Sequence, residues 1–334
     1  MVETEIEMPS PPAPSASPPR SRRRFLRTAA ATVGTGLTTA VAGCSTRNLF
    51  SEVDVQFRTL AVGSPPVGLT TAGVWLVAAG RDGQVVGLDR GDGQARWEAN
   101  PVEDLRVPPV GHEGELYVAG EAVVSVNGAI ERWRTPLPGL ASALTVSAES
   151  VVAVGTEHGH VIAVAFDART GEERWRAGHV ASAVASADSS VLLGRRRVHS
   201  VRDGDVAWSH DTENNWTTGI VPVRTASVSE SSAGARWLLA GTRTGEGGDV
   251  LALTADGERL WRHRLRGGAV ALTPATDGRF VVGIEGEHPG VQQFTAAGET
   301  RWFFETETSV VDVVFGGDWV WTVTGSARVV GLSE

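Results

Sequence analysis

The sequence predicts an all-β fold assembled from repeats, and three observations carry that prediction. A glycine, three or four further residues and then a tryptophan recur six times, and the tryptophans are Trp97, Trp133, Trp175, Trp208, Trp261 and Trp302. Successive tryptophans are 36, 42, 33, 53 and 41 residues apart. Each signature is preceded by an apolar run, a polar turn and a second apolar stretch.

The apolar runs are continuous and only a few residues long, which is typical of strands buried on both faces. In the first unit, residues 74–79 form such a run, residues 81–83 form a turn and residues 84–88 form the returning strand. Equivalent runs lie at residues 116–119, 151–154, 191–193, 237–240, 280–282 and 319–323. The order of elements is the same in every unit, so one supersecondary unit is repeated along the chain.

Counting the units predicts how they are arranged. Seven runs stand against six tryptophan signatures, so the last unit, which ends at residues 329–332, lacks its outermost strand. Residues 53–60 alternate apolar and polar side chains and belong to no repeat. Radial repetition buries the faces of four-stranded sheets and protects their edges. We therefore predict a seven-bladed β-propeller of four-stranded antiparallel blades over residues 53–334, closed by strand 53–60 in the last blade, with the six tryptophans packed against neighbouring blades.

One unit also carries a recognisable motif. Ala165, Asp167, Thr170, Gly171 and Trp175 follow the pattern Ala-x-Asp-x-x-Thr-Gly-x-x-x-Trp. The pattern resembles the repeat of the pyrroloquinoline-quinone-like (PQQ-like) propeller family, and the resemblance extends over about residues 53–334. Asp and Thr accept hydrogen bonds from nearby backbone amides and Gly allows a positive φ, so we interpret these residues first as turn formers.

The N-terminal residues carry export signals. Residues 1–20 are rich in Pro and Ser, which is typical of a disordered leader. Residues 21–27 match the twin-arginine export pattern, with Arg22 and Arg23 as the arginine pair. The apolar stretch at residues 28–43 is shorter than the roughly 20 residues of a spanning helix.

Residues 41–44 resemble a lipobox that ends at Cys44, the only cysteine of the chain. We therefore expect residues 1–43 to be a leader with a lipoprotein signal peptide, Cys44 to carry the lipid and residues 44–52 to be a tether. Cleavage without lipidation and an uncleaved leader are the alternatives. A single cysteine excludes an intramolecular disulfide and a cysteine-based metal site within this sequence.

The charge of the chain excludes one class of partner. The net charge is −9 and all 30 basic residues are arginine. An acidic surface repels nucleic acid, so no nucleic-acid partner is expected. The chain resembles proteins of salt-loving archaea in its surplus of acidic residues, its lack of lysine and its twin-arginine signal. A GC-rich genome also favours arginine.

Three further groups of residues are candidates for metal binding, anion binding or N-glycosylation. His158 and His160 could face one side of a strand, but no third ligand is evident, so we expect a solvated hairpin and no metal site. Residues 195–197 are three arginines at an expected turn, which favours solvation over an anionic partner. Asn215 opens an Asn-x-Thr sequon in a stretch, residues 211–218, that we expect to be an exposed loop open to N-glycosylation.

No catalytic motif appears, so no catalytic or cofactor-binding residue is assigned. The leading hypothesis is a monomeric, lipid-anchored, BamB-like propeller on the outer face of the cytoplasmic membrane, acting without catalysis as a scaffold for unknown surface proteins. The resemblance also implies an alternative, a quinoprotein oxidoreductase using PQQ and calcium. The missing cysteine pair and the expected blade number argue against it. A surface lipoprotein that binds a small molecule is the other alternative.

Overall fold

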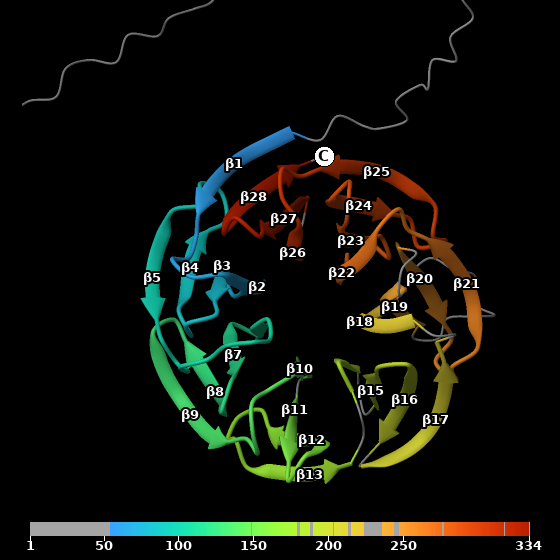
Figure 1. The fold of residues 1–334 in the computed structure, drawn as a ribbon. Coiled ribbons are helices and arrows are strands. Elements are labelled where there is room, and N and C mark those ends of the chain that lie inside the picture. Colours follow the sequence, from blue (N-terminus) through green and yellow to red (C-terminus); the bar gives the residue numbers. More distant parts are fainter. Residues whose placement is uncertain are drawn as a thin grey trace, which may run out of the picture. The chain divides into compact units, whose positions relative to one another are not determined.

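Four-stranded antiparallel sheets arranged in a ring make up the fold in the computed structural model (Figure 1). The structure describes residues 54–333 except residues 148, 179–180, 188–189, 203, 213–214, 224–235, 244–246, 276 and 317. The chain divides into two units, residues 1–47 and 48–334, and all described residues lie in the second. The predicted all-β propeller with four-stranded antiparallel blades is confirmed. No helix among the described residues is long and apolar enough to cross a membrane.

Six of the sheets are each built from four consecutive strands. In the first three, the strands are β2 (Pro66–Ala72), β3 (Trp75–Gly80), β4 (Val85–Asp89) and β5 (Ala95–Ala99); β6 (Val110–His112), β7 (Glu115–Ala119), β8 (Ala122–Asn127) and β9 (Ile130–Pro136); and β10 (Ala143–Val146), β11 (Ser150–Glu157), β12 (His160–Asp167) and β13 (Glu173–Ala177). In the next three they are β14 (Ala183–Ala187), β15 (Ser190–Gly194), β16 (Arg197–Arg202) and β17 (Asp205–Asp211); β18 (Asn215–Val223), β19 (Arg236–Arg243), β20 (Gly247–Leu253) and β21 (Arg259–Arg264); and β22 (Gly268–Pro274), β23 (Phe280–Glu285), β24 (Gly290–Phe294) and β25 (Thr300–Glu305).

The remaining sheet is composite, because it joins segments from the two ends of the described chain. It contains β26 (Val310–Gly316), β27 (Trp319–Thr324), β28 (Arg328–Ser333) and β1 (Asp54–Leu60), in the order β26-β27-β28-β1. β1 pairs antiparallel with β28, with Val55 opposite Leu332 and Leu60 opposite Arg328. Figure 1 shows β1, in blue, lying outside the red strands. We call this sheet the composite blade.

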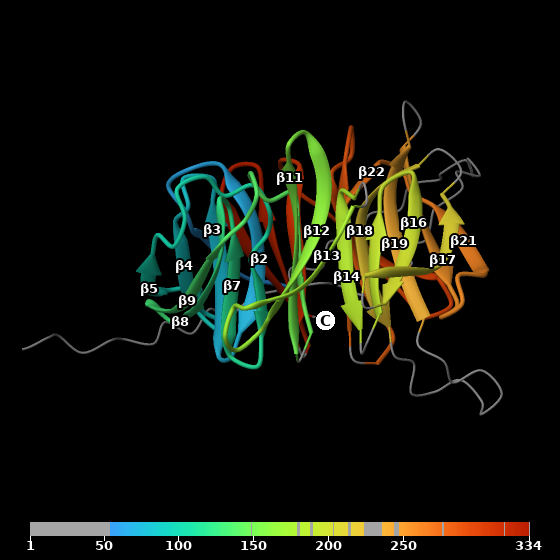
Figure 2. The same cartoon turned by 90° about the horizontal axis from the view of Figure 1, so that it is seen from below.

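Burial follows the position of a strand in its blade. The first strand of each blade lies toward the centre of the ring and the fourth lies on the rim (Figure 1), and the strands run between the two faces of the ring (Figure 2). The predicted apolar runs are the second strands, and β3 and β4 are almost completely buried. The rim strands β5 and β13 alternate exposed and half-buried residues. A strand that is covered on both faces favours a continuous apolar run, whereas a rim strand favours alternating polar and apolar residues.

The hydrophobic core lies between neighbouring blades rather than at a single centre. One cluster joins Tyr117 and Val123 of the β6–β9 blade to Val151 and Phe166 of the β10–β13 blade. Another joins Leu76 of the first blade to Trp321 of the composite blade. Each blade therefore depends on both of its neighbours, which is the reason that closing the ring stabilises it.

Candidate functional site

The Asp-x-x-Thr-Gly segment at residues 167–171 is a hydrogen-bonded turn. Asp167 Oδ1 accepts from the backbone amides of Arg169 and Thr170 at 2.9 and 3.0 Å. Gly171 has a φ of +75°, a backbone conformation that glycine adopts at little steric cost. The Arg174 guanidinium and the two backbone amides hold the pKa of Asp167 near 2. The motif is accordingly a structural turn here, as its residue types predict.

Trp133, Trp208 and Trp261 each pack against the corresponding turn of the following blade. Trp133 Nε1 donates to the carbonyl of Ala168 at 3.0 Å, and the side chain of Thr135 donates to the carbonyl of Gly171. Trp208 Nε1 donates in the same way to Ala255 at 2.8 Å. Figure 1 shows these rim strands in adjacent blades. At these two interfaces the tryptophan of one blade is therefore held by the turn of the next.

The contact is not uniform around the ring. A Cβ added at Gly257 would collide with Trp208, and one added at Gly298 would press on Trp261. Neither Gly128 nor Gly204 has an aromatic ring within 4 Å of such a Cβ, so Trp97 and Trp175 are placed differently. These two glycines lie in turns whose sequences depart from the full motif.

The composite blade uses a phenylalanine in place of the tryptophan. A Cβ at Gly93 would lie 2.6 Å from the ring of Phe57, which belongs to β1. In β28, Gly331 lies opposite Phe57, just as Gly87 lies opposite Trp97 in the first blade. The packing of Phe57 against the next blade was not predicted from the sequence. The signal that could have indicated it was the position of Phe57 in the alternating segment, residues 53–60.

A rim aromatic faces a small residue on the third strand in most blades. The residues opposite the rim aromatics are Gly87, Ser125, Ala165, Ser200, Ala252 and Gly331. The exception is Gln293, which lies opposite Trp302. Gln293 is 0% exposed, and neither its Nε2 nor its Oε1 has a hydrogen-bond partner in the structure. Sequence reasoning missed it, although Gln293 stands where the repeat pattern carries Ala165.

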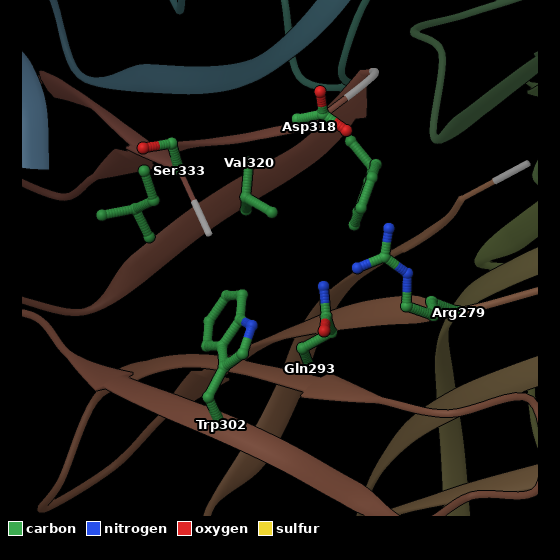
Figure 3. A pocket seen from close by; sticks show the side chains of 8 residues that line it. Arg279, Gln293, Trp302, Asp318, Val320 and Ser333 are labelled. Atoms are coloured by element: carbon green, nitrogen blue, oxygen red, sulfur yellow. The ribbon is translucent and has the colours of Figure 1, made fainter. Parts of the chain in front are cut away.

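Gln293 lines a cavity of about 90 Å³ between the β22–β25 blade and the composite blade. Trp302 and Arg279 lie beside it, and Val320, Leu332 and Ser333 come from the composite blade. Figure 3 shows Gln293 and Arg279 facing Asp318, Val320 and Ser333 across this space. We call it the closure cavity.

The closure cavity lies where other blades have a turn. Elsewhere a turn joins the third and fourth strands, and the turns at Gly171, Gly257 and Gly298 lie against the tryptophan of the preceding blade. In the composite blade these strands are β28 and β1, which are paired but not consecutive, so no such turn connects them. The cavity thus lies beside a pair of strands that are not consecutive in the chain.

The positive charge beside the closure cavity, Arg279, already has interaction partners. The Arg279 guanidinium forms an ion pair with Asp277 and lies 5.4 Å from the centre of the Phe315 ring. Its side chain is 22% exposed, whereas Asp318 is exposed. The cavity therefore has aromatic walls, one buried carboxamide and no surplus of positive charge.

A second, more open cavity of about 300 Å³ lies between the β6–β9 and β10–β13 blades. Tyr117 and Trp133 form its apolar wall, with ring centroids 6.0 Å apart, and Tyr117 also donates to the carbonyl of Ala168. His112 Nε2 is buried without a hydrogen-bond partner and lies 3.9 Å from Glu113 Oε1. Arg132 and Arg169 at its rim add positive charge.

Side chains on the innermost strands join neighbouring blades. Asp312 of β26 accepts from the backbone amides of Leu69 and Val313, each at 2.8 Å. Thr218 of β18 donates to the carbonyl of Ala269 at 2.7 Å. Burial raises the pKa of Asp312 to about 7, against the lowering effect of its two amide donors.

The two candidate histidines and the three arginines at residues 195–197 do not form a common site. His158 has a φ of +50° and Gly159 one of +83°, so these residues form the two-residue turn between β11 and β12. His160 begins β12 and residues 158–160 are exposed, which agrees with the solvated hairpin that was expected. The arginines at residues 195–197 lie at the turn and start of β16, as expected.

The predicted glycosylation site is not in a loop. Asn215 is the first residue of the innermost strand β18, so the expectation that residue 215 lies in a loop was wrong. Val53 is not among the described residues, and Arg22, Arg23 and Cys44 also lie outside them.

The described residues include no group of three or more His, Cys, Asp or Glu side chains that could hold a metal ion. They therefore offer no acidic donor set for calcium, and we derive no step through a bound quinone. The tryptophan-lined closure cavity is also far too small for a tricyclic cofactor, since a cavity of about 150 Å³ holds one benzene ring.

Comparisons with known proteins agree with this architecture. The profile of the family described as outer membrane protein assembly factor BamB matches residues 81–198. The crystal structure of BamB from Moraxella catarrhalis is similar at 16% identity and a TM-score of 0.59, covering 85% of this chain and 98% of that one. These findings support a PQQ-like β-propeller family.

A second solved structure shares the fold. The WD40 β-propeller domain of Doa1 is similar at 11% identity and a TM-score of 0.68, covering 85% of this chain and 98% of that one. No curated protein matches the sequence. At these identities the likeness concerns the fold, and function has to be argued from the chain itself.

Proposed function

We propose that this protein is a non-enzymatic protein-interaction scaffold on the outer face of the cytoplasmic membrane, anchored by a lipid on Cys44. The observation that carries the proposal is the BamB-like propeller fold, in which hydrogen-bonded turns and rim aromatics hold rigid blades together. Rigid blades present loops and strand edges at fixed positions, which suits the binding of other proteins. The turn carboxylates Asp89 and Asp167 bind backbone amides and arginines, which is a structural role.

The proposed location rests on the N-terminal sequence. Arg22 and Arg23 match a twin-arginine signal, which exports folded proteins, and Cys44 follows a lipobox-like segment. A monomer with an acidic surface would remain soluble beside the membrane and would not bind nucleic acid. Its partners are then proteins at the cell surface.

Cell fractionation tests the location. Replacing Arg22 and Arg23 together by Lys should leave the protein in the cytoplasm, whereas Arg24→Lys should not affect export. Cys44→Ala should release the exported protein from the membrane and remove the mass of the lipid from the N-terminal peptide. Membrane localisation of all three variants would refute the proposed anchor and route.

Chemical crosslinking in intact cells tests the scaffold role. We expect the wild-type protein, and not the Cys44→Ala variant, to crosslink to defined surface proteins that mass spectrometry identifies. The purified propeller should also show no dye-linked alcohol oxidation after PQQ and calcium are added. Turnover with these cofactors, or an anchored protein without crosslinked neighbours, would contradict a non-enzymatic scaffold.

A further inference from the structure

The closure cavity contains a polar group without a partner. Both polar atoms of the Gln293 carboxamide are buried and unpaired, although its side chain is 0% exposed. Burying an unpaired carboxamide is unfavourable, so such a group usually has a partner that completes its hydrogen bonds. The chain uses Gly, Ala or Ser at the equivalent position of the other blades, and none of these brings a carboxamide into the interface.

The size of the cavity limits the occupant. A cavity of about 150 Å³ holds benzene, with six non-hydrogen atoms, so the 90 Å³ of the closure cavity suits roughly four. The end of an asparagine or glutamine side chain has this size. A larger cofactor or a nucleotide does not fit.

The donors and acceptors limit it further. A carboxamide offers an N–H donor beside an oxygen acceptor, and its best complement offers the same pair in reverse. A carboxylate would accept from Gln293 Nε2 and leave Oε1 unpaired. Arg279 is already paired with Asp277, and Asp318 lies at the cavity, so the surrounding charge does not favour an anion.

We propose that the closure cavity is a binding site for a neutral primary carboxamide, supplied by an asparagine or glutamine side chain of a partner protein. Both polar atoms of Gln293 are buried in this structure, so its carboxamide has to turn toward the cavity to form the two hydrogen bonds. The walls formed by Trp302, Phe315 and Val320 cover the aliphatic part of the ligand. The identity of the occupant as a protein side chain rests on the proposed scaffold function, whereas the chemistry of the cavity does not.

Acetamide and acetate provide matched probes, since they have the same size and differ in charge and in the presence of an N–H donor. Saturation-transfer NMR on the full-length protein should show acetamide binding with a dissociation constant no tighter than about tens of micromolar, given four atoms of contact. Acetate should bind at least tenfold more weakly.

Two variants locate the binding site. Gln293→Leu removes both polar atoms with little change in size, and it should weaken acetamide binding at least tenfold. Gln292→Leu is the matched control, because the adjacent Gln292 already donates to Thr300 Oγ1 at 2.9 Å, and it should bind acetamide like the wild type. Should Gln293→Leu fail to fold, Gln293→Ala serves instead, since the chain already places alanine opposite Trp175 and Trp261.

Three results would overturn the proposal: no acetamide binding, unchanged binding by the Gln293 variants, or tighter binding of acetate. The first would mean that water completes the hydrogen bonds of Gln293. Acetamide binding that depends on Gln293 in a protein without crosslinked surface partners would retain the chemistry of the cavity and reject the scaffold. Crosslinked partners without acetamide binding would reject the cavity alone.

Discussion

The indole of Trp133 lies so close to Gly171 of the next blade that a Cβ added to this glycine would be 2.6 Å from the ring atom Cε3. The turn and the rim strand of two blades therefore meet without room for a methyl group. At this interface the glycine in the turn and the tryptophan on the strand therefore depend on each other.

Replacing Gly171 by alanine should destabilise the protein through both the clash and the backbone. We expect a loss of about 2–4 kcal/mol in the free energy of unfolding, combining overpacking with the left-handed φ. Gly159→Ala is the control, because Gly159 also has a positive φ but has nothing within 4 Å of its Cβ position. Denaturant titration of both variants tests this, and equal losses would show that Trp133 does not resist the added methyl group.

Removing a rim tryptophan should cost most where the ring is fully buried. Trp302 is 0% exposed, so Trp302→Ala should cost about 3–5 kcal/mol by leaving a cavity. Trp175 is only half-buried, so Trp175→Ala should cost less. Calorimetry on the two variants compares them, and a larger loss for Trp175→Ala would contradict the burial argument.

Asp249 and Arg262 form an ion pair in which the carboxylate is 3% exposed, with Arg262 Nη2 at 2.7 Å from Asp249 Oδ2. Replacing Arg262 by methionine leaves a buried charge without this partner, so we expect a loss of about 3–5 kcal/mol in stability. Arg176→Met breaks the exposed pair with Glu173 and should cost about 1 kcal/mol or less. Urea denaturation should separate the two variants; equal losses would mean that burial does not govern the Asp249 pair.

Asp312 should make the stability of the ring depend on pH. Burial raises its pKa from 3.8 to about 7, so between these values the folded state binds more protons than the unfolded state. The contribution of Asp312 is therefore fully present below about pH 4 and is lost as the pH rises through about 7.

Asp312→Asn should remove this contribution to the pH dependence. Its amide nitrogen cannot accept from Leu69 or Val313, so one backbone donor loses its partner at a cost of about 1–3 kcal/mol. Unfolding free energies measured from pH 4 to pH 8 on both proteins test the assignment. A parallel decline in the variant would assign the pH dependence to other groups.

Local chemistry made much of the fold predictable. The apolar runs predicted the second strands because both faces of these strands are covered. Asp167 and Gly171 predicted the turn because their hydrogen bonds and φ are local. Phe57 could be placed on a strand by alternation alone, whereas its contact with Gly93 depends on how the ends of the described chain meet.

The candidate site was not predictable in the same way. Gln293 becomes unusual only when Trp302 and the composite blade surround it, and a single sequence does not show which polar atoms will lack partners. Asn215 was misplaced because the boundaries of strands depend on backbone geometry that residue spacing does not specify.

The pairing of β1 with β28 also affects how the protein is made. When a ribosome synthesises the chain, β1 emerges before the other described strands and cannot pair with β28 until β2 to β27 have been translated. Up to that moment its backbone edge and the side of Phe57 that will meet Gly331 are open to other nascent chains. Completion of this sheet is therefore a late event in folding. Premature termination of translation would leave an open ring in which the edge of β1 is unpaired and prone to aggregation.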